Sequence, residues 1–366
     1  MKIGVLTSSR ADYSIYKPLL EQIRKEKNWE LGIIVFGTHL SEKYGMTVQA
    51  IKNDGFAIDY CLDTMPEDDQ PASISSAMGK TIQHFSEVWK NASYDWVIAL
   101  GDRYEMFAAV AASLPFNIRI AHLHGGETTL GAIDNAFRHS ISHMAKLHFV
   151  AAEPYRKRLA EILGNEKNIY NTGALSIDNL STLPLYTTEE FFQHFHIDLK
   201  TPTILITFHP ETISFEKNED FSDTIIESLR EVKDYQYLVT MPNADTMGLS
   251  IRQKLITFAE KNNRCFLLEN LGTVGYLSAM KHCSFMLGNT SSGFIEAAFF
   301  PKWVINLGDR QKGRILTSNI LQTDIDKKQI LEAIQKIQSS PLPARQEIYG
   351  DGKAAEKIVH LLKEKS

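Results

Sequence analysis

The stretch WVIALGDRYEMFAAVAASL, residues 96–114, decides the fold of this chain. It starts with a short apolar run, continues with a glycine, an acid and a base, and then places apolar residues at helical spacing. A run this continuously apolar is typical of a strand that is buried on both faces of a parallel sheet. The stretch therefore predicts a strand, a loop that carries Asp102 and Arg103, and a helix.

The same pattern recurs along the chain. Apolar runs alternate with amphipathic segments from KIGVLTSS, residues 2–9, to KLHFVAA, residues 146–152. Another such run, IRIAHLHGG at residues 118–126, ends in two glycines. Alternating strands and helices predict the α/β class, with parallel sheets covered by helices on both faces.

The alternation divides the chain into two parts. It stops near residues 173–200, where Ser, Thr and Pro are more frequent, and resumes with TPTILITFHPE. We therefore expect a doubly wound N-terminal domain at 1–172 and a second one at 173–352. An amphipathic helix at 353–366 can close either domain, and packing back on the first is one of the two possibilities.

Composition excludes several classes of protein. The chain has 366 residues, of which 43% are hydrophobic and 23% charged, and its formal net charge is −5. This balance is that of a globular protein and does not favour a nucleic-acid or acidic-membrane surface. The three cysteines form no CxxC, and neither a signal segment nor a membrane-length apolar run is present. We expect a cytoplasmic protein with neither nucleic-acid nor membrane partners.

The loops that follow the predicted strands of the first half combine acids with bases. Parallel α/β sheets bind ligands at the carboxyl ends of their strands, so these loops are the places to examine. TSSRADYS, residues 7–14, lacks the GxGxxG pattern, so a dinucleotide such as NAD is not indicated. It offers Arg10, Asp12 and Ser14 instead.

The segment HLHGGETTLGAIDNAFRHS, residues 122–140, supplies a second group of acids and bases. Its candidates are Glu127, Asp134, Arg138 and His139. Together with Asp102, these side chains suit general acid–base chemistry. The alternative is that the acids stabilise helix N-termini and form surface ion pairs. Several histidines lie nearby, but HExxH is missing, so no metal site is expected.

In the second half, GNTSSGFIEAAFF at residues 288–300 has the pattern of an anion site. A strand ends there and a helix is predicted to start near Ser292, so free N–H groups would lie beside the hydroxyls of Thr290, Ser291 and Ser292. The alternative is an ordinary helix cap without a ligand. Glu296 is either a helix-stabilising acid or an acceptor for ribose hydroxyls.

Three further loops of the second half carry polar residues directly after strands. GDRQKGR, residues 308–314, contains Arg310 and Arg314, and guanidinium groups suit phosphate; a solvated loop is the alternative. His209 in FHPET could donate to a diphosphate or simply end a strand. Asn243 in MPNADTMG could bind a ligand or form a turn.

Taken together, these stretches resemble the hydrolysing UDP-N-acetylglucosamine 2-epimerases of sialic acid biosynthesis. They occur in the order found in that family and cover nearly the whole chain, up to about residue 315. A close relative acts on UDP-2,4-diacetamido-2,4,6-trideoxyglucose in the legionaminic acid route and shares them. One departure is Thr290, where many members have Ser, and it keeps the hydroxyl. The matching pieces are SRADYS, LGDRYE, HLHGGETTLGAID, RHSISHMA, FHPET, NADT, GNTSSG with the later Glu296, and INLGDRQKGR.

The resemblance implies two Rossmann-like domains that face each other across a cleft in the GT-B arrangement, with UDP held mainly by the C-terminal domain. It also implies a homodimer or homotetramer and no redox cofactor. By position, the nucleotide-binding residues would be His209, Asn243, Thr290, Ser291, Glu296 and Arg310, joined from the first domain by Arg10, Ser14 and Arg103. The acid–base groups would be Asp102, Glu127, Asp134 and His139, with Asp12 close by.

The chemistry that the resemblance implies starts with removal of the proton at sugar C-2 while UDP departs from C-1. Water then adds to the resulting 2-acetamidoglucal at C-1, and a proton returns to C-2 from the opposite face. The products from UDP-N-acetylglucosamine would be N-acetylmannosamine and UDP. In this scheme Asp102 faces the sugar and Arg103 faces the diphosphate. The alternatives are the same reaction on the 2,4-diacetamido sugar, a GT-B glycosyltransferase, or a nucleotide-sugar sensor without catalysis.

Overall fold

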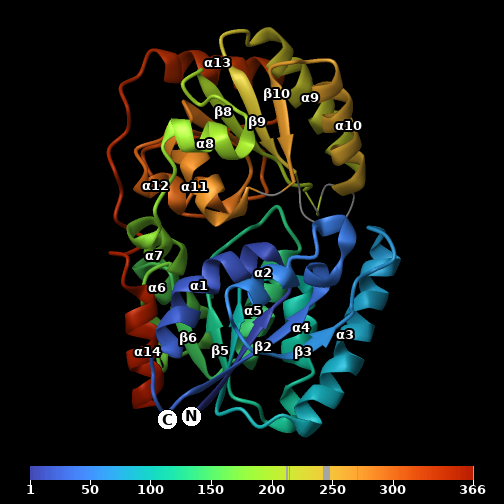
Figure 1. Cartoon of the computed structure of the whole chain (residues 1–366), viewed down its shortest axis with the longest axis vertical. Coiled ribbons are helices and arrows are strands. Elements are labelled where there is room, and N and C mark those ends of the chain that lie inside the picture. The colour runs from blue at the N-terminus through green and yellow to red at the C-terminus, as the bar shows by residue number, and fades with distance from the viewer. Residues whose placement is uncertain (212, 214, 242–247, 270, 366) are drawn as a thin grey trace. The chain divides into compact units, whose positions relative to one another are not determined.

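The computed structural model describes residues 1–211, 213, 215–241, 248–269 and 271–365 (Figure 1). The chain forms two compact units, and each is built from more than one segment. The first unit comprises Met1–Glu127, Asp134–Thr182 and Ile348–Ser366. The second comprises Thr128–Ile133 and Leu183–Glu347.

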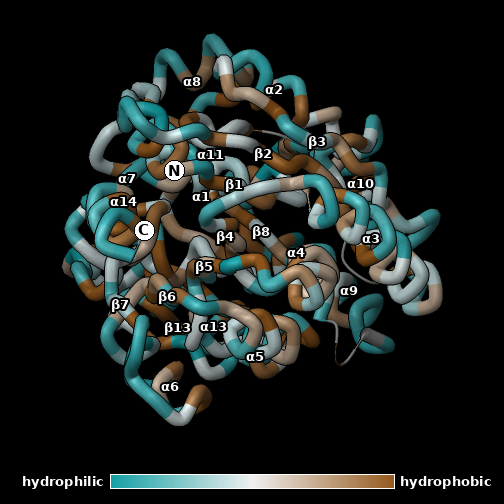
Figure 2. The backbone as a smooth tube through the Cα atoms, turned by 90° about the horizontal axis from the view of Figure 1, so that it is seen from below, coloured by the Kyte–Doolittle hydropathy of each residue, from teal (hydrophilic) through white to brown (hydrophobic). Residues whose placement is uncertain are grey.

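The first unit is built on a parallel sheet. Within the described residues the strand order is β3-β2-β1-β4-β5-β6-β7, and every neighbouring pair is parallel. The central strands β1 and β4 are largely apolar and buried, as expected where helices cover both faces, whereas the edge strand β3 is only partly buried; Figure 2 shows hydrophobic colour along β2 and β4. Their bounds are β1 Lys2–Thr7, β2 Glu30–Phe36, β3 Ile58–Leu62, β4 Trp96–Leu100, β5 Ile120–Leu123, β6 Leu147–Val150 and β7 Ile169–Asn171.

Helices pack on both faces of this sheet and produce two cores. One core joins α1 and α14 to the sheet around Tyr16 and Ile358, and the other joins α3 and α4 around Phe85 and Met106. Short 3-10 turns occupy Gly37–Leu40, Glu42–Tyr44 and Leu114–Phe116. The helices are α1 Arg10–Arg24, α2 Val48–Asn53, α3 Pro71–Asn91, α4 Tyr104–Ala111, α5 Asp134–Met144, α6 Glu153–Leu163, α7 Leu175–Thr182 and α14 Ala354–Glu364.

The second unit repeats the design with a parallel sheet ordered β10-β9-β8-β11-β12-β13 over the described residues. Its strands are β8 Thr203–Thr207, β9 Gln236–Thr240, β10 Cys265–Leu268, β11 Phe285–Gly288, β12 Val304–Leu307 and β13 Ile320–Thr323. Its helices are α8 Thr188–Phe195, α9 Asn218–Glu231, α10 Gly248–Glu260, α11 Gly272–His282, α12 Glu296–Phe299 and α13 Lys327–Gln338, with 3-10 turns at Phe215–Lys217 and Ser291–Gly293. The expected fold class, α/β with two Rossmann-like domains, is confirmed.

Both sheets have a point at which the strand order reverses. In the first unit it lies between β1 and β4, and in the second between β8 and β11. Loops that leave these strands diverge to opposite sides, which opens a crevice at the carboxyl ends where doubly wound sheets bind ligands. Four of the loops singled out from the sequence begin at Ser8, Gly101, Phe208 and Asn289, directly after these four strands.

The C-terminal helix α14 belongs to the first unit, where it packs against α1 and α7 (Figure 1). Asp178 of α7 is buried and accepts hydrogen bonds from the backbone N–H groups of Ala354 (3.0 Å) and Ala355 (2.8 Å). Asn179 of α7 donates to the Ser14 carbonyl of α1 at 2.9 Å. These bonds explain why the first unit extends through Thr182, beyond the expected boundary after residue 172.

No helix among the described residues is long and apolar enough to cross a bilayer.

Replacing Asp178 with Ala should weaken the attachment of α14, because two buried N–H groups at the start of that helix lose their acceptors. We expect a loss of about 2 kcal/mol in the free energy of unfolding, measured by urea titration. The matched control is Asp351→Ala, since Asp351 lies just before α14 but is exposed and pairs with Lys357. Equal losses in the two variants would contradict the capping role of Asp178.

Candidate functional site

The loop after β1 is organised by Asp12. Its carboxylate accepts hydrogen bonds from the backbone N–H groups of Ser8 (2.9 Å) and Ser9 (3.1 Å) and from the Ser8 hydroxyl (2.8 Å). Ser9 in turn caps α1 by accepting from the Asp12 N–H, which completes a capping box. Arg10 and Ser14 lie in the first turns of α1 and are partly exposed. The structure thus employs the Asp12 carboxylate in shaping the loop.

A buried histidine that the sequence analysis did not single out supports the same loop. His39 follows β2, and its two ring nitrogens lie 2.9 Å from the Thr7 hydroxyl and 2.7 Å from the Thr47 hydroxyl. Its side chain is fully buried, and this burial lowers its pKa to about 4. The partners of His39 lie far from it in sequence, so no local pattern could have revealed it.

In the loop after β4, the Arg103 side chain is held in place by a buried acid, Glu105. The Arg103 guanidinium donates to both carboxylate oxygens of Glu105, at 3.1 and 3.0 Å. Glu105 is fully buried, and this burial raises its pKa although Arg103 opposes the shift. A bidentate pair of this kind fixes the plane of the guanidinium. Glu105 lies inside the LGDRYE stretch, and an acid two residues after Arg103 was the available signal.

Asp102 of the same loop forms an ion pair with Arg138 of α5, so the structure brings these two predicted residues together. Arg138 is almost completely buried, and neither its Nε nor its Nη1 has a hydrogen-bond partner. The next residue, His139, is half-buried with an unpartnered Nδ1. Burial first, and then the nearby charge of Arg138, lowers the pKa of His139, which favours a neutral ring.

His122, the third residue of β5, has a structural role. Its Nε2 donates to the Gly101 carbonyl at 2.8 Å, so its Nδ1 must accept from the Ser142 hydroxyl, 2.9 Å away. Burial lowers the pKa of His122 to about 3. This neutral ring ties the end of β5 to the loop after β4 and to α5.

Two residues further on, His124 contacts Glu127. The distance between His124 Nδ1 and Glu127 Oε1 is 2.6 Å, and both side chains are buried. Asp134, the last of the predicted acids, is the first residue of α5 and is partly buried. The carboxyl edge of the first sheet therefore carries two acid–base pairs, Asp102 with Arg138 and Glu127 with His124.

In the second unit, Asn289 connects the loops on either side of the reversal point. Its side-chain oxygen accepts from the His209 backbone N–H at 2.7 Å, and its amide donates to the His209 carbonyl at 2.8 Å. Asn289 is fully buried. Its position inside GNTSSG drew no prediction because the hydroxyl residues around it dominated the pattern.

The hydroxyl-rich turn is tighter than expected. Instead of one helix that starts near Ser292, a 3-10 turn at Ser291–Gly293 precedes the four-residue α12. Thr290 caps this turn, with its hydroxyl 3.4 Å from the Ser292 N–H, and Ser292 lies 2.5 Å from the Tyr276 hydroxyl. Gly293 packs closely against β12, since a Cβ there would lie 3.0 Å from the Val304 side chain.

The loop after β12 is tied to the same turn. Gln311 donates to the Asn289 carbonyl at 2.8 Å and accepts from the buried Arg314 at 2.5 Å. Arg310 donates to the Pro210 carbonyl at 3.2 Å, in the loop after β8. The loops thus form one connected set that places His209, Thr290, Ser291, Ser292, Arg310 and Arg314 at the carboxyl edge. Glu296 lies buried in α12, whereas Asn243 falls outside the described residues.

Residues Thr128–Ile133, which follow Glu127 directly, pack on this loop as part of the second unit. The Leu130 N–H donates to the Lys312 carbonyl at 2.9 Å. A Cβ on Gly131 would overlap the backbone of Asp309, and one on Gly313 would overlap Thr128. The two glycines therefore allow backbones to approach that larger residues would keep apart.

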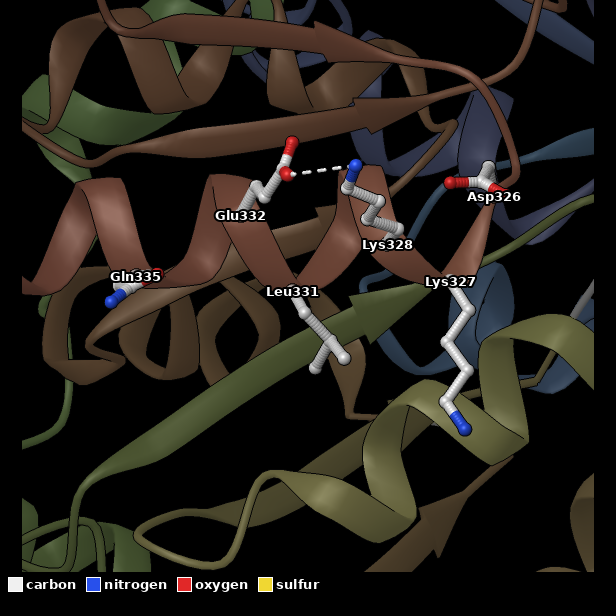
Figure 3. A pocket seen from close by; sticks show the side chains of 6 residues that line it. All are labelled: Asp326, Lys327, Lys328, Leu331, Glu332 and Gln335. Atoms are coloured by element: carbon white, nitrogen blue, oxygen red, sulfur yellow. Dashed lines mark ion pairs between the residues drawn. The ribbon is translucent and has the colours of Figure 1, made fainter.

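Among the described residues, neither a metal-ligand cluster nor the pocket on α13 adds a candidate site. The described residues contain no group of three or more His, Cys, Asp or Glu side chains that could hold a metal. A shallow pocket on α13 is lined by Asp326, Lys327, Lys328, Leu331, Glu332 and Gln335 (Figure 3). Its lining comes from α13 and the residue that caps it, and its charges are exposed, as the Lys328–Glu332 pair at 3.9 Å shows. It has the character of an ordinary solvated helix surface.

Comparison with known proteins identifies the family. The family model described as UDP-N-acetylglucosamine 2-epimerase matches residues 21–363. The GDP/UDP-N,N'-diacetylbacillosamine 2-epimerase (hydrolyzing) of Campylobacter jejuni is 35% identical over 339 residues, which cover 92% of this chain and 88% of that protein. The UDP-N,N'-diacetylbacillosamine 2-epimerase (hydrolyzing) of Legionella pneumophila is 32% identical over 362 residues, 99% of this chain and 95% of the relative.

Relatives of lower sequence identity carry a name from the same family or share the fold. The UDP-N-acetylglucosamine 2-epimerase of Neisseria meningitidis is 29% identical over 335 residues, 92% of this chain and 87% of that protein. The crystal structure of the Methanocaldococcus jannaschii enzyme in complex with UDP-GlcNAc and UDP shares the fold, with a TM-score of 0.84, 17% identity and full coverage of both chains. This chain belongs to the UDP-N-acetylglucosamine 2-epimerase family of enzymes, and the resemblance to its hydrolysing members is confirmed.

The buried histidines of the first unit make its stability depend on pH. Burial lowers the pKa of His39 and His148 to about 4 and that of His122 to about 3, from an ordinary value of 6.5. Below pH 6.5 the unfolded chain therefore binds protons that the folded chain does not. The free energy of unfolding should fall by about 1.4 kcal/mol per pH unit for each histidine as pH drops from about 6 to 4.5.

Urea titrations across this pH range test the effect. His148→Leu should reduce the slope by the contribution of one histidine, whereas His84→Gln, at an exposed position of α3, should leave the slope unchanged. An unaltered slope in His148→Leu would count against the assignment.

Asn289→Asp should destabilise the second unit, because a carboxylate oxygen would replace the amide that donates to the His209 carbonyl. We expect a loss of about 1–3 kcal/mol in the free energy of unfolding. Asn262→Asp is the matched control, since Asn262 uses its side-chain oxygen to accept from the Arg264 N–H, a bond that Asp preserves. The assignment fails if both variants unfold at the same urea concentration.

Proposed function

We propose that the protein is a hydrolysing 2-epimerase that converts a UDP-2-acetamido sugar and water into UDP and the free sugar inverted at C-2. The observation that carries the proposal is the pairing of Asp102 with Arg138 and of Glu127 with His124 at one sheet edge, in a chain of this family. Such pairing supplies acids and bases close to one another, which a proton removed and returned at carbon requires.

The second unit is proposed to bind the leaving group. Arg310 and Arg314 suit the diphosphate, while His209 and the Thr290, Ser291 and Ser292 hydroxyls add donors. Glu296 and Asn243 are proposed to contact the nucleoside part of UDP. The bonds from Asn289 and Gln311 support this assignment, because they hold the donors in place before any ligand arrives.

The first unit is proposed to act on the sugar. One group among Asp102, Glu127, Asp134 and His139 removes the C-2 proton, and another returns a proton to the opposite face. Arg138 orients Asp102, while Asp12 shapes the loop that presents Arg10 and Ser14. Arg103, held by Glu105, is proposed to donate to the diphosphate.

The roles proposed for the two units give the following steps of the reaction. As the C-2 proton leaves, its electron pair forms a C-1 to C-2 double bond and the bond from C-1 to the UDP oxygen breaks. Arginines and hydroxyls stabilise the negative charge that develops on UDP. Water then adds to C-1 of the 2-acetamidoglucal, and C-2 receives a proton from the face opposite to the first.

Similarity favours one substrate over the other. The relatives at 35% and 32% identity are named for N,N'-diacetylbacillosamine, which is 2,4-diacetamido-2,4,6-trideoxyglucose, and the relative at 29% is named for UDP-N-acetylglucosamine. We therefore place UDP-N,N'-diacetylbacillosamine first and UDP-N-acetylglucosamine second, whereas the sequence motifs, which both groups of enzymes share, do not distinguish the two sugars. As the resemblance implies, we also propose that the enzyme is a homodimer or homotetramer.

Turnover of both UDP sugars in deuterated water, followed by NMR, tests the function. We expect UDP and a free sugar inverted at C-2 that carries one solvent deuterium there. Release of a UDP sugar epimerised without hydrolysis would contradict the hydrolytic reaction. Turnover that requires a sugar acceptor would indicate a glycosyltransferase, and UDP binding without exchange at C-2 would indicate a sensor.

Arg310→Gln should lower kcat/KM by about 10²-fold, because a charged donor to the departing diphosphate is lost. Lys312→Gln is the matched control, since Lys312 lies on the same loop but is exposed and pairs with Asp309. The kcat/KM of each variant is measured from the steady-state rate of UDP release. If the two substitutions lowered kcat/KM equally, Arg310 would not belong to the proposed diphosphate site.

A further inference from the structure

The backbone of His124 adopts a conformation that residues other than glycine seldom take. Its φ is 65°, in the left-handed region, and its side chain is buried. Strain of this kind persists only where the surroundings impose it, and it is concentrated at functional sites. The His124 N–H donates to the Phe149 carbonyl at 3.0 Å, which fixes the residue to the end of β6.

The glycines that follow His124 leave the loop no freedom to relax. A Cβ on Gly126 would overlap the Tyr155 carbonyl of α6, and one on Gly125 would lie 3.0 Å from the Ser142 hydroxyl of α5. The HGG segment is therefore packed between two helices, and its shape sets the direction of the His124 ring.

One nitrogen of the His124 ring makes a hydrogen bond, and the other has no hydrogen-bond partner. Because a carboxylate oxygen can only accept, the 2.6 Å contact with Glu127 requires Nδ1 of His124 to carry the hydrogen. In the neutral ring, Nε2 is then an acceptor, and it is buried without a hydrogen-bond partner. An unsatisfied buried polar group destabilises the fold, so packing alone does not account for this nitrogen.

Comparison with His122 makes the difference clear. His122 belongs to the same strand end, yet both of its nitrogens are bonded, to the Gly101 carbonyl and the Ser142 hydroxyl. His122 thus serves the fold, whereas the bond that His124 makes is to an acid proposed to act on the sugar.

We propose that His124 is a positioning residue for the 2-epimerase reaction: its Nδ1–H holds the Glu127 carboxylate in the orientation needed for proton transfer at C-2. This inference rests on the proposed function. It predicts that His124 affects the chemical step and leaves the binding of UDP unaltered.

Two substitutions separate the ring from the backbone. His124→Gly removes the hydrogen bond to Glu127 but accepts a positive φ without strain, so the fold should be preserved. His124→Asn also tolerates the left-handed conformation, and its amide can donate to Glu127. We expect kcat to fall by about 10²-fold in His124→Gly with KM nearly unchanged, and to be largely restored in His124→Asn.

The matched control is His196→Gly. His196 is also a histidine at positive φ (57°), but it is exposed at the C-terminus of α8 in the second unit. This variant should keep the kcat and KM of the wild type. Calorimetric titration with UDP should give the same affinity for the wild type and both His124 variants.

The outcomes separate this proposal from the function on which it rests. If the wild type turns over neither UDP sugar, the proposed function fails. If the wild type is active, three results overturn the role of His124: a kcat in His124→Gly equal to that of the wild type, equal losses in His124→Gly and His124→Asn, or a loss of UDP affinity in His124→Gly.

Discussion

Reversal of strand order within each sheet is the constraint on which the rest of the structure depends. Between β1 and β4, and again between β8 and β11, neighbouring parallel strands send their chains to opposite sides. No helix then covers the carboxyl ends at these points, so the loops there can hold polar groups that the sheet core excludes. Asp102 of the first unit and His209 and Thr290 of the second occupy this kind of position, and the His124–Glu127 pair and Arg310 follow the adjacent strands β5 and β12.

Polar residues at these edges are held by their own neighbours before any ligand binds. Asn289 exchanges two hydrogen bonds with the His209 backbone, and Glu105 accepts two hydrogen bonds from the Nε and Nη2 edge of the Arg103 guanidinium. Groups fixed in this way lose little conformational entropy on binding and need little reorganisation during the reaction. The supporting residues are thus as much a part of the site as the residues they hold.

The fold class and the position of the site could be predicted from the sequence because both depend on local patterns. Continuous apolar runs identified the buried strands, and polar residues directly after them identified the edge. The supporting contacts could not be predicted, because they join residues distant in sequence, such as His39 with Thr7 or Arg138 with Asp102. Asp12 shows the limit within a single loop: the sequence indicated an acid near the site but not that its carboxylate bonds the backbone of Ser8 and Ser9.

The attachment of α14 through Asp178 has a consequence for how the chain is made. A ribosome synthesises the first unit's sheet early, but it reaches α14 only after the whole of Leu183–Glu347 has emerged. Until then, the apolar surface of α1 that α14 covers has no partner, and the Asp178 carboxylate has no helix to cap. The first unit, although its sheet is translated first, therefore cannot complete its core until the last residues of the chain have been made.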